Sequence, residues 1–220
     1  MHPVLRLYED VLSGGGNAEF HLPPLPRFIF VVHGSAAIGK KTLAEGETWQ
    51  GEGATTVKPH SGGVTCWRWE LARGDQGSTT ANAPGMTTHE KLTAFLEMLP
   101  KGDLLMRGDS VAFPPGGCAY LHRHQGPGIR CLIEGGIRID THGRSTSYGP
   151  GGAWYESGPD AVFAQAAADN TSRFIRVMIL PRGLAGKSSI QYVTEEDKAK
   201  PKSQQYKIYA DAPIAFEARK

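Results

Sequence analysis

Apolar and polar residues alternate over two runs in the middle of the chain, and this pattern predicts a pair of β-strands within residues 116–135. The second run covers residues 129–133 and ends at a glycine turn. Residues two apart on a strand point to the same side, so His122 and His124 in the first run share one face. Tyr120 joins them if the strand runs straight.

A different period predicts a helix between the two halves of the chain. Its apolar positions recur at helical spacing at Leu92, Phe95, Leu96 and Leu99. Thr87 and Glu90 match a capping box at its start, and Pro100 ends the run. We expect this helix to pack between two domains or across the end of one.

The predicted strand pair carries regularly spaced glycines and histidines, which read Gly116-x5-His122-x-His124-x3-Gly128-x6-Gly135. Gly135 suits a position that needs a positive φ. Neutral imidazole is a common ligand of zinc, copper, nickel and iron, so two imidazoles on one face of a strand can approach one ion. The spacing therefore favours a metal site.

This spacing resembles the first motif of the cupin superfamily, in which a glycine, two histidines, a glutamate and a second glycine stand at these intervals. Gly128 occupies the glutamate position here. The family's second motif contributes a third histidine, and Val162 occupies that position in the matching stretch, residues 151–162. The resemblance implies an all-β double-stranded β-helix, or jelly-roll, barrel whose usual ligand set is incomplete.

The first half of the chain repeats the frame as Gly15-x5-His21-x-Pro23-x3-Arg27-x6-Gly34. The repeat continues downstream, where Trp49 matches Trp154 in similar glycine contexts and Ala72-Arg73-Gly74 matches Pro181-Arg182-Gly183. Internal repeats indicate architecture. We therefore predict a duplicated barrel, or bicupin, whose first copy has lost its ligands.

The predicted fold class is all-β, with two cupin-type jelly-roll barrels and a linking helix. A degenerate N-terminal barrel covers residues 1–80, a linker with the helix 81–101, the barrel with the site 102–194, and a C-terminal extension 195–220. A barrel of about 100 residues lies in the usual size range of a domain, so two fit. Alternation at Tyr206, Ile208 and Ala210 predicts an edge strand in the extension. The family resemblance implies a homodimer.

The composition argues against two classes of binding partner, nucleic acids and membranes. The net charge is +2, without a basic run interleaved with aromatics, which argues against nucleic acid. No apolar stretch approaches the roughly 20 residues of a membrane span, and the first residues are unlike a signal peptide. Cys66, Cys118 and Cys131 form an odd set without close pairing, which indicates free thiols. We expect a cytoplasmic protein without membrane partners.

Two histidines hold a divalent ion weakly, and catalytic metal centres usually have three protein ligands and an open position. Glu156 is our candidate for the third donor, because its strand should lie near the histidine strand in a cupin barrel. The alternative for Glu156 is a rim carboxylate paired with a cation such as Arg130. Asp160 and Gln165 are the other candidate donors.

Three further residues are candidates for catalysis. Arg130 falls on the inward face if parity runs on from His124, and a guanidinium there needs an anion, either Glu156 or a substrate carboxylate. A solvent-facing arginine is the alternative. Tyr120 and Tyr155 are expected to line a pocket for a small ligand, together with Trp154 and Phe163.

Three functions remain open. The first is a metal-dependent dioxygenase or related oxidoreductase with a His/His/carboxylate centre, in which Arg130 orients a small anionic substrate. We expect iron there, with manganese, nickel, zinc or copper as alternatives. The second is a metal-free isomerase or epimerase in which a histidine and Tyr120 or Tyr155 act as base and acid. The third is a non-catalytic binding or sensing barrel. We predict the first function, because metal binding explains a pair of histidines better than acid–base catalysis does.

Overall fold

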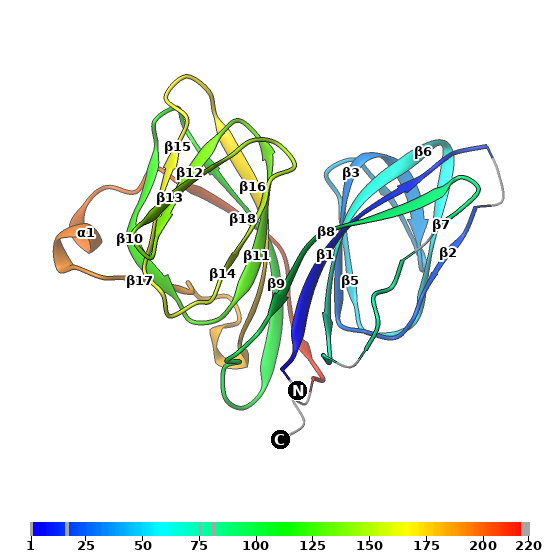
Figure 1. Cartoon of the computed structure of the whole chain (residues 1–220), viewed down its shortest axis with the longest axis horizontal. Helices are drawn as coiled ribbons and strands as arrows, with labels where there is room; N and C mark the ends of the chain where they lie inside the picture. Colours follow the sequence, from blue (N-terminus) through cyan, green and yellow to red (C-terminus); the bar gives the residue numbers. More distant parts are fainter. Residues whose placement is uncertain (1, 16–17, 75, 81, 217–220) are drawn as a thin grey trace. The chain divides into compact units, whose positions relative to one another are not determined.

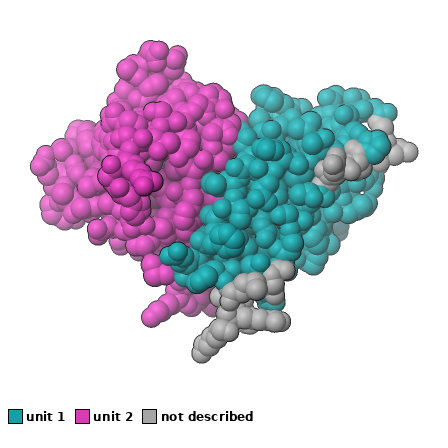
Figure 2. All heavy atoms as spheres, in the orientation of Figure 1, with its two compact units in different colours: residues 1–97, 215–220 teal, residues 98–214 magenta. Residues whose placement is uncertain are grey.

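The computed structural model describes residues 2–15, 18–74, 76–80 and 82–216. The chain divides into two compact units (Figures 1 and 2). Residues 1–97 with 215–220 form the first unit, and residues 98–214 form the second. No helix within the described ranges is long and apolar enough to cross a membrane.

The described residues of the first unit form one antiparallel sheet of eight strands. The strands are β1 (Val4–Leu12), β2 (Phe20–Leu22), β3 (Arg27–Ile38), β4 (Lys41–Ala44), β5 (Thr48–Gly51), β6 (Thr55–Ala72), β7 (Asn82–Ala83) and β8 (Met86–Phe95). They follow the order β4-β3-β6-β1-β8-β7, with β2 on β6 and β5 on β3. An apolar cluster that includes Phe20, Ile29 and Val57 forms a core on this sheet.

The prediction of a helix after residue 86 is wrong, because residues Met86–Phe95 form strand β8. It pairs with β1 from Met86 opposite Leu12 to Phe95 opposite Val4. A short apolar run does not separate helix from strand by its period alone, and pairing with a neighbouring strand decided the outcome. Phe95, which the helical period would have buried, is 64% exposed.

The second unit consists of two five-stranded antiparallel sheets. One sheet has the order β13-β12-β15-β10-β17 and the other β14-β11-β16-β9-β18. Their strands are β9 (Leu104–Phe113), β10 (Cys118–His124), β11 (Gly128–Glu134), β12 (Ile137–Thr141), β13 (Arg144–Tyr148), β14 (Ala153–Glu156), β15 (Val162–Ala166), β16 (Ser172–Pro181), β17 (Ile190–Tyr192) and β18 (Gln205–Ile214). The 3-10 helix η1 (Arg182–Leu184) and the short helix α1 (Glu195–Ala199) complete the unit.

The predicted strand pair is present as β10 and β11, which lie in different sheets. An apolar cluster that includes Phe113, Leu132 and Phe174 draws on both sheets. The edge strand predicted at Tyr206 is confirmed as β18, which pairs with β9. This part of the C-terminal extension therefore belongs to the second unit.

Strand pairing repeats between the two units at the positions that the sequence repeat matches. In the first unit Ile29 lies opposite Trp49 on one side and Arg68 on the other. In the second unit Arg130 lies opposite Trp154 and Arg176 in the same way. The correspondence continues two residues earlier on each central strand, so that Gly51 of the first unit has the register position that Glu156 has in the second.

Candidate metal centre

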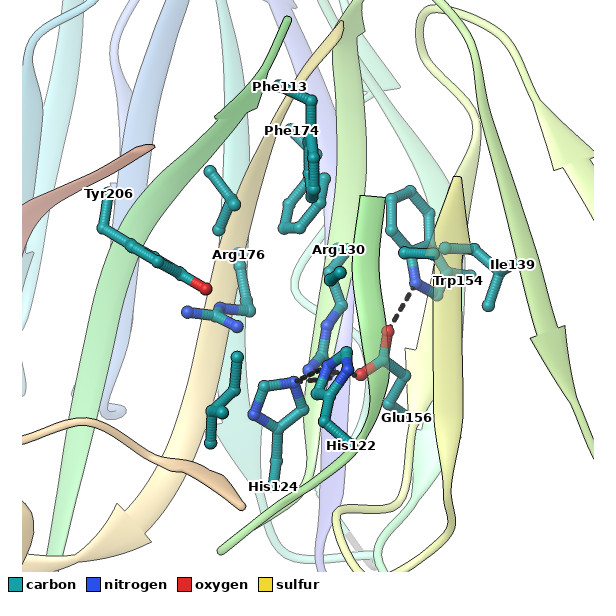
Figure 3. A pocket seen from close by; sticks show the side chains of 14 residues that line it. Phe113, His122, His124, Arg130, Ile139, Trp154, Glu156, Phe174, Arg176 and Tyr206 are labelled. Atoms are coloured by element: carbon teal, nitrogen blue, oxygen red, sulfur yellow. Dashed lines mark hydrogen bonds and ion pairs between the residues drawn. The ribbon is translucent and has the colours of Figure 1, made fainter. Parts of the chain in front are cut away.

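His122 and His124 lie side by side on β10 and point into the interior of the second unit (Figure 3). Both are buried, and their Nε2 atoms are 3.2 Å apart. Strand β10 pairs with β15 on one side and with β17 on the other. These two pairings hold the end of β10 that carries the histidines in the sheet. The expectation that the two imidazoles share one face is confirmed.

Glu156 reaches the histidines from the opposite sheet. Its strand, β14, pairs with β11 so that Glu156 lies opposite Gly128. Its Oε2 atom is 3.4 Å from His124 Nε2. One ligand atom from each of His122, His124 and Glu156 falls within 4.8 Å of the others, and all three residues are buried. These residues could hold one metal ion, as the sequence analysis predicted for this set.

Gly128 stands at the position where the cupin motif has its glutamate, and the structure leaves no room for a side chain there. A Cβ atom at Gly128 would collide with the carbonyl oxygen of Val177 and lie 3.1 Å from an Arg130 guanidinium nitrogen. A side chain therefore does not fit at this position without a backbone shift. Glu156 lies directly opposite Gly128 on the paired strand β14.

The hydrogen bonds of the histidines leave acceptor atoms facing one another. His122 Nδ1 lies 2.6 Å from the Tyr120 carbonyl oxygen, which can only accept, so Nδ1 carries the proton of the neutral ring. His122 Nε2 is then an acceptor, hydrogen-bonded to His124 Nε2 at 3.2 Å and close to the Glu156 carboxylate. Such convergence of lone pairs is favourable when a cation or a proton lies between them.

Burial keeps the two rings neutral. Desolvation lowers the pKa of His122, against the attraction of Glu156. Desolvation, reinforced by the charges of Arg130 and Arg176, holds the pKa of His124 well below its usual value. Neutral imidazole is the form that binds metal, so the site is prepared for an ion at neutral pH.

Arg130 points inward and is only 1% exposed, which rules out the solvent-facing alternative. Its Nη2 atom lies 2.7 Å from Glu156 Oε2, an ion pair without hydrogen-bond geometry. Its Nη1 donates to the Gly128 carbonyl at 2.7 Å. Burial lowers the pKa of Arg130 to about 10, against the opposing effect of Glu156.

The sequence analysis missed a second arginine. Arg176 on β16 donates two hydrogen bonds to Asp109 on β9, of 2.9 and 2.6 Å, and it lines the same pocket. Burial alone would lower the pKa of Arg176, but Asp109 outweighs it and raises the pKa. An arginine inside the apolar run from Phe174 to Leu180 was the available signal.

The pocket above the histidines is small and mostly apolar. The volume that the centre of a water-sized sphere can reach is about 20 Å³. This space suits about one water molecule or one ion. Its lining residues, besides the three candidate ligands and the two arginines, are Val111, Phe113, Ala119, Ile139, Trp154, Ala164, Phe174, Ile190 and Tyr206. Tyr206 is 48% exposed and stands at the rim.

Tyr120 and Tyr155 are not among the residues that line this pocket. The pairing of β10 with β15 shifts register between Ala119 and His122, so parity along β10 is broken before the histidines. The Tyr120 ring instead lies near the ammonium groups of Lys200 and Lys202. Tyr155 alternates with Trp154 and Glu156 on β14, which directs it to the other face.

The remaining donor candidates lie elsewhere. Asp160 forms an ion pair with His142 at 3.3 Å and accepts a hydrogen bond from Ser157. Gln165 donates to the carbonyl oxygens of Gly116 and Gly117. Phe163 is also absent from the pocket lining. Of the candidate third donors, Glu156 is therefore the one that joins the histidines.

The corresponding positions of the first unit hold no such group among the residues that the structure describes. The His21 side chain is 75% exposed, and Pro23 and Gly51 offer no ligand atom. The interior instead holds ion pairs, with Arg27 on Glu70 at 2.6 Å and Arg68 on Asp10 at 2.6 Å.

No protein-family model matches the chain, and no curated protein matches it by sequence. Solved structures do resemble it. One of them is a structure of oxalate decarboxylase from Bacillus subtilis, which was solved to study the Mn(II) centres of that enzyme. It aligns with a TM-score of 0.61 and 12% identity, and the alignment covers 89% of this chain and 73% of that chain. AerE from Microcystis aeruginosa aligns with a TM-score of 0.56 at 14% identity over 82% of this chain and 89% of that chain. At identities this low, these likenesses show that the chain has a similar fold.

Proposed function

We propose that the second unit is a metal-dependent enzyme in which His122, His124 and Glu156 hold a divalent transition metal. The observation that carries the proposal is the convergence of these three buried ligand atoms within 4.8 Å. Three protein ligands leave coordination positions open, as in catalytic rather than structural metal sites. The Mn(II) centres of oxalate decarboxylase, which has a similar fold, support a metal in this kind of barrel.

The donor set narrows the metal. Two imidazoles and one carboxylate are the set that non-haem Fe(II) oxygenases use, and they also suit manganese. We therefore propose Fe(II) or Mn(II), with oxidation of a small molecule as the reaction class. A bound ion of this kind would supply redox chemistry and polarise a substrate oxygen at the open positions.

The charge around the site favours a small anionic substrate. Glu156 and Asp109 balance the charges of Arg130 and Arg176, so a divalent ion would leave the pocket with a net positive charge. Arg130 is the residue we assign to orienting the substrate, because its guanidinium already lies beside the ligand carboxylate. The apolar wall formed by Val111, Phe113 and Phe174 would exclude water from the reacting atoms.

We also propose that the first unit is a degenerate copy of the second. The matching registers around Ile29 and Arg130 support a duplication. His21, Pro23 and Gly51 then stand where the second unit has its three candidate ligands. The buried ion pairs of Arg27 and Arg68 indicate that this copy serves a structural role.

The test is metal analysis of protein purified without an affinity tag. We expect about one metal ion per chain in the wild type and loss of the metal in His122→Ala and Glu156→Ala. His21→Ala is the matched control, because it removes the histidine at the corresponding position of the first unit and should keep the metal. Wild-type protein that binds no iron, manganese or cobalt after reconstitution would refute the proposal and favour a metal-free or binding function.

A further inference from the structure

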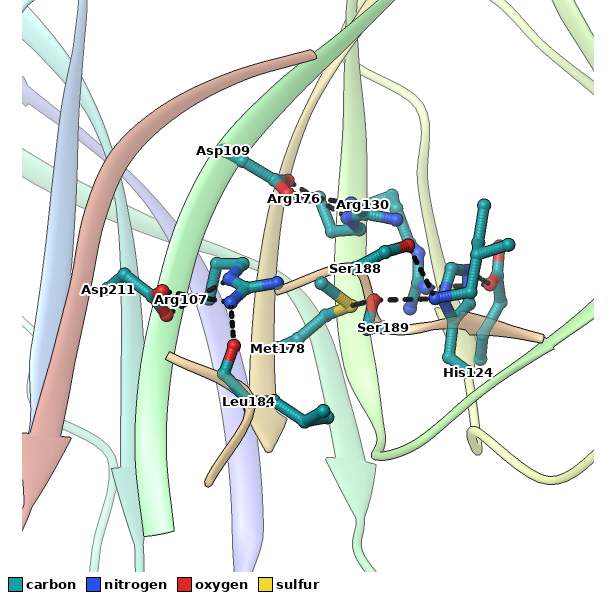
Figure 4. Close-up of polar contacts among 12 residues, drawn as sticks. Arg107, Asp109, His124, Arg130, Arg176, Met178, Leu184, Ser188, Ser189 and Asp211 are labelled. Atoms are coloured by element: carbon teal, nitrogen blue, oxygen red, sulfur yellow. Dashed lines mark hydrogen bonds and ion pairs between the residues drawn. The ribbon is translucent and has the colours of Figure 1, made fainter. Parts of the chain in front are cut away.

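A loop carries a hydroxyl group to the outer side of the metal centre. Ser189 lies between η1 and β17 and is 4% exposed. Its Oγ atom is 3.3 Å from His124 Nδ1, and its hydroxyl donates to Met178 Sδ at 3.7 Å (Figure 4). The Ser189 hydroxyl oxygen also has lone pairs, so it can accept a hydrogen bond from the imidazole when Nδ1 carries the ring proton.

His124 needs such an acceptor when its Nε2 atom binds a metal. The single proton of the neutral ring then sits on Nδ1, and a buried N–H requires a partner. His122 has its partner in the main chain of its own strand, the Tyr120 carbonyl. His124 Nδ1 instead meets the side chain of Ser189 on a separate loop. The orientation of the His124 ring therefore depends on where that loop lies.

One buried arginine fixes the loop. Arg107 on β9 is 3% exposed and donates to the carbonyl oxygens of Leu184 at 2.7 Å and Lys187 at 2.8 Å. It also forms two hydrogen bonds with Asp211, of 3.0 and 2.9 Å. Asp211 in turn accepts from the backbone N–H of Gly186 at 2.6 Å. The Arg107–Asp211 pair therefore holds the segment that precedes Ser189 at three points of its backbone.

We propose that Ser189 and Arg107 are positioning residues for His124. Arg107 holds the loop, the loop presents Ser189, and the Ser189 hydroxyl fixes the orientation and proton position of the ring. This inference rests on the proposed metal centre. It adds a role for Arg107, which does not line the pocket. Partners of this outer kind fix the tautomer of a ligand histidine and raise its basicity.

The experiment is a Co²⁺ titration of the full-length metal-free protein, followed by visible absorption. In Ser189→Ala we expect the Co²⁺ affinity to fall about 10- to 100-fold and the absorption band to shift, because His124 loses its acceptor. In Arg107→Lys we expect a loss of about tenfold, because one ammonium group cannot serve two carbonyls and a bidentate carboxylate. Circular dichroism of each metal-free variant verifies that it is folded.

Arg138→Lys is the matched control. Arg138 on β12 also forms a bidentate pair with an aspartate, Asp140, but its side chain is exposed and the hydrogen bonds of this pair do not include the loop before Ser189. It should bind Co²⁺ like the wild type. Wild-type affinity and an unshifted band in Ser189→Ala, while His122→Ala loses Co²⁺, would overturn this inference and leave the proposed centre intact. A wild type that does not bind Co²⁺ would overturn both.

Discussion

Trp154 donates its indole N–H to Glu156 Oε1 over 2.9 Å, and the two residues stand two apart on β14. The bond leaves the second oxygen, Oε2, directed at His124 and Arg130. A carboxylate held at one oxygen needs little reorganisation before it binds an ion through the other. The indole is therefore part of the candidate metal centre, although it offers no ligand atom.

Replacing Trp154 with Phe removes this donor and keeps an aromatic ring in the core. We expect the metal affinity to fall about 10- to 100-fold, measured by isothermal titration calorimetry with Mn²⁺. Trp49→Phe is the control, because Trp49 has the corresponding register position in the first unit. Equal affinities in the two variants would show that the indole does not orient the carboxylate.

Val162 lies opposite His122 in the pairing of β10 with β15, so their side chains share a face. Val162→His should therefore add a fourth donor and increase the metal affinity. Without metal the buried imidazole should lower the stability by about 1–3 kcal/mol. Thermal unfolding with and without Mn²⁺ separates the two effects, and Val162→Thr controls for polarity. A variant that gains neither affinity nor a larger metal-induced stabilisation contradicts the predicted orientation.

The metal-free protein should lose stability in mild acid. Burial lowers the pKa of both His122 and His124. An unfolded chain takes up protons on these rings below about pH 6.5, whereas the folded chain resists protonation there. Stability is thus fully present above about pH 6.5 and falls as the pH drops toward the folded values, by at most about 1.4 kcal/mol per ring and pH unit.

Urea unfolding of metal-free protein at several pH values between 5 and 8 measures this slope. A His122→Gln, His124→Gln double variant should show a flatter dependence over the same range. An identical slope in the double variant would assign the acid sensitivity to other groups. His21→Gln, which changes an exposed histidine, should keep the wild-type slope.

Arg68 is the centre of the buried ion pairs in the first unit. It donates two hydrogen bonds to Asp10, and its guanidinium lies 2.7 Å from Glu70. Arg68→Met should destabilise the metal-free protein by about 3–5 kcal/mol, because it leaves the buried Asp10 carboxylate without its ion pair. Thermal unfolding provides the measurement. The exposed Arg138→Met should have little effect, and both variants should keep the metal if the first unit is structural.

The sequence predicted that His122, His124 and Glu156 lie close together, and the two histidines follow from a short-range rule. His122 and His124 are two residues apart on one strand, and β10 keeps that period between them. Glu156 was reached through the resemblance to cupins, which brought its strand next to the histidines. Tyr120 was misplaced because the register shift before His122 breaks the alternation, and nothing in the residues marks that shift.

Other parts depended on contacts that no local pattern encodes. The segment 86–95 has apolar residues at helical spacing but pairs with β1 along its whole length. Arg176 sits in an apolar run of β16, and its role follows from Asp109 on a strand far away in sequence. Ser189 belongs to a loop without periodicity, so its approach to His124 appears only in the folded chain.

The pairing of Gly128 with Glu156 has a consequence for how such proteins are recognised. A search pattern reads residues along one strand and expects the acidic ligand four positions after the second histidine, where this chain has Gly128. Here the candidate carboxylate, Glu156, stands opposite that position on the paired strand, and a side chain at residue 128 would collide with the Val177 carbonyl. Chains that carry their acid across the ladder are invisible to the linear motif, and a search over paired positions of a folded barrel would recover them.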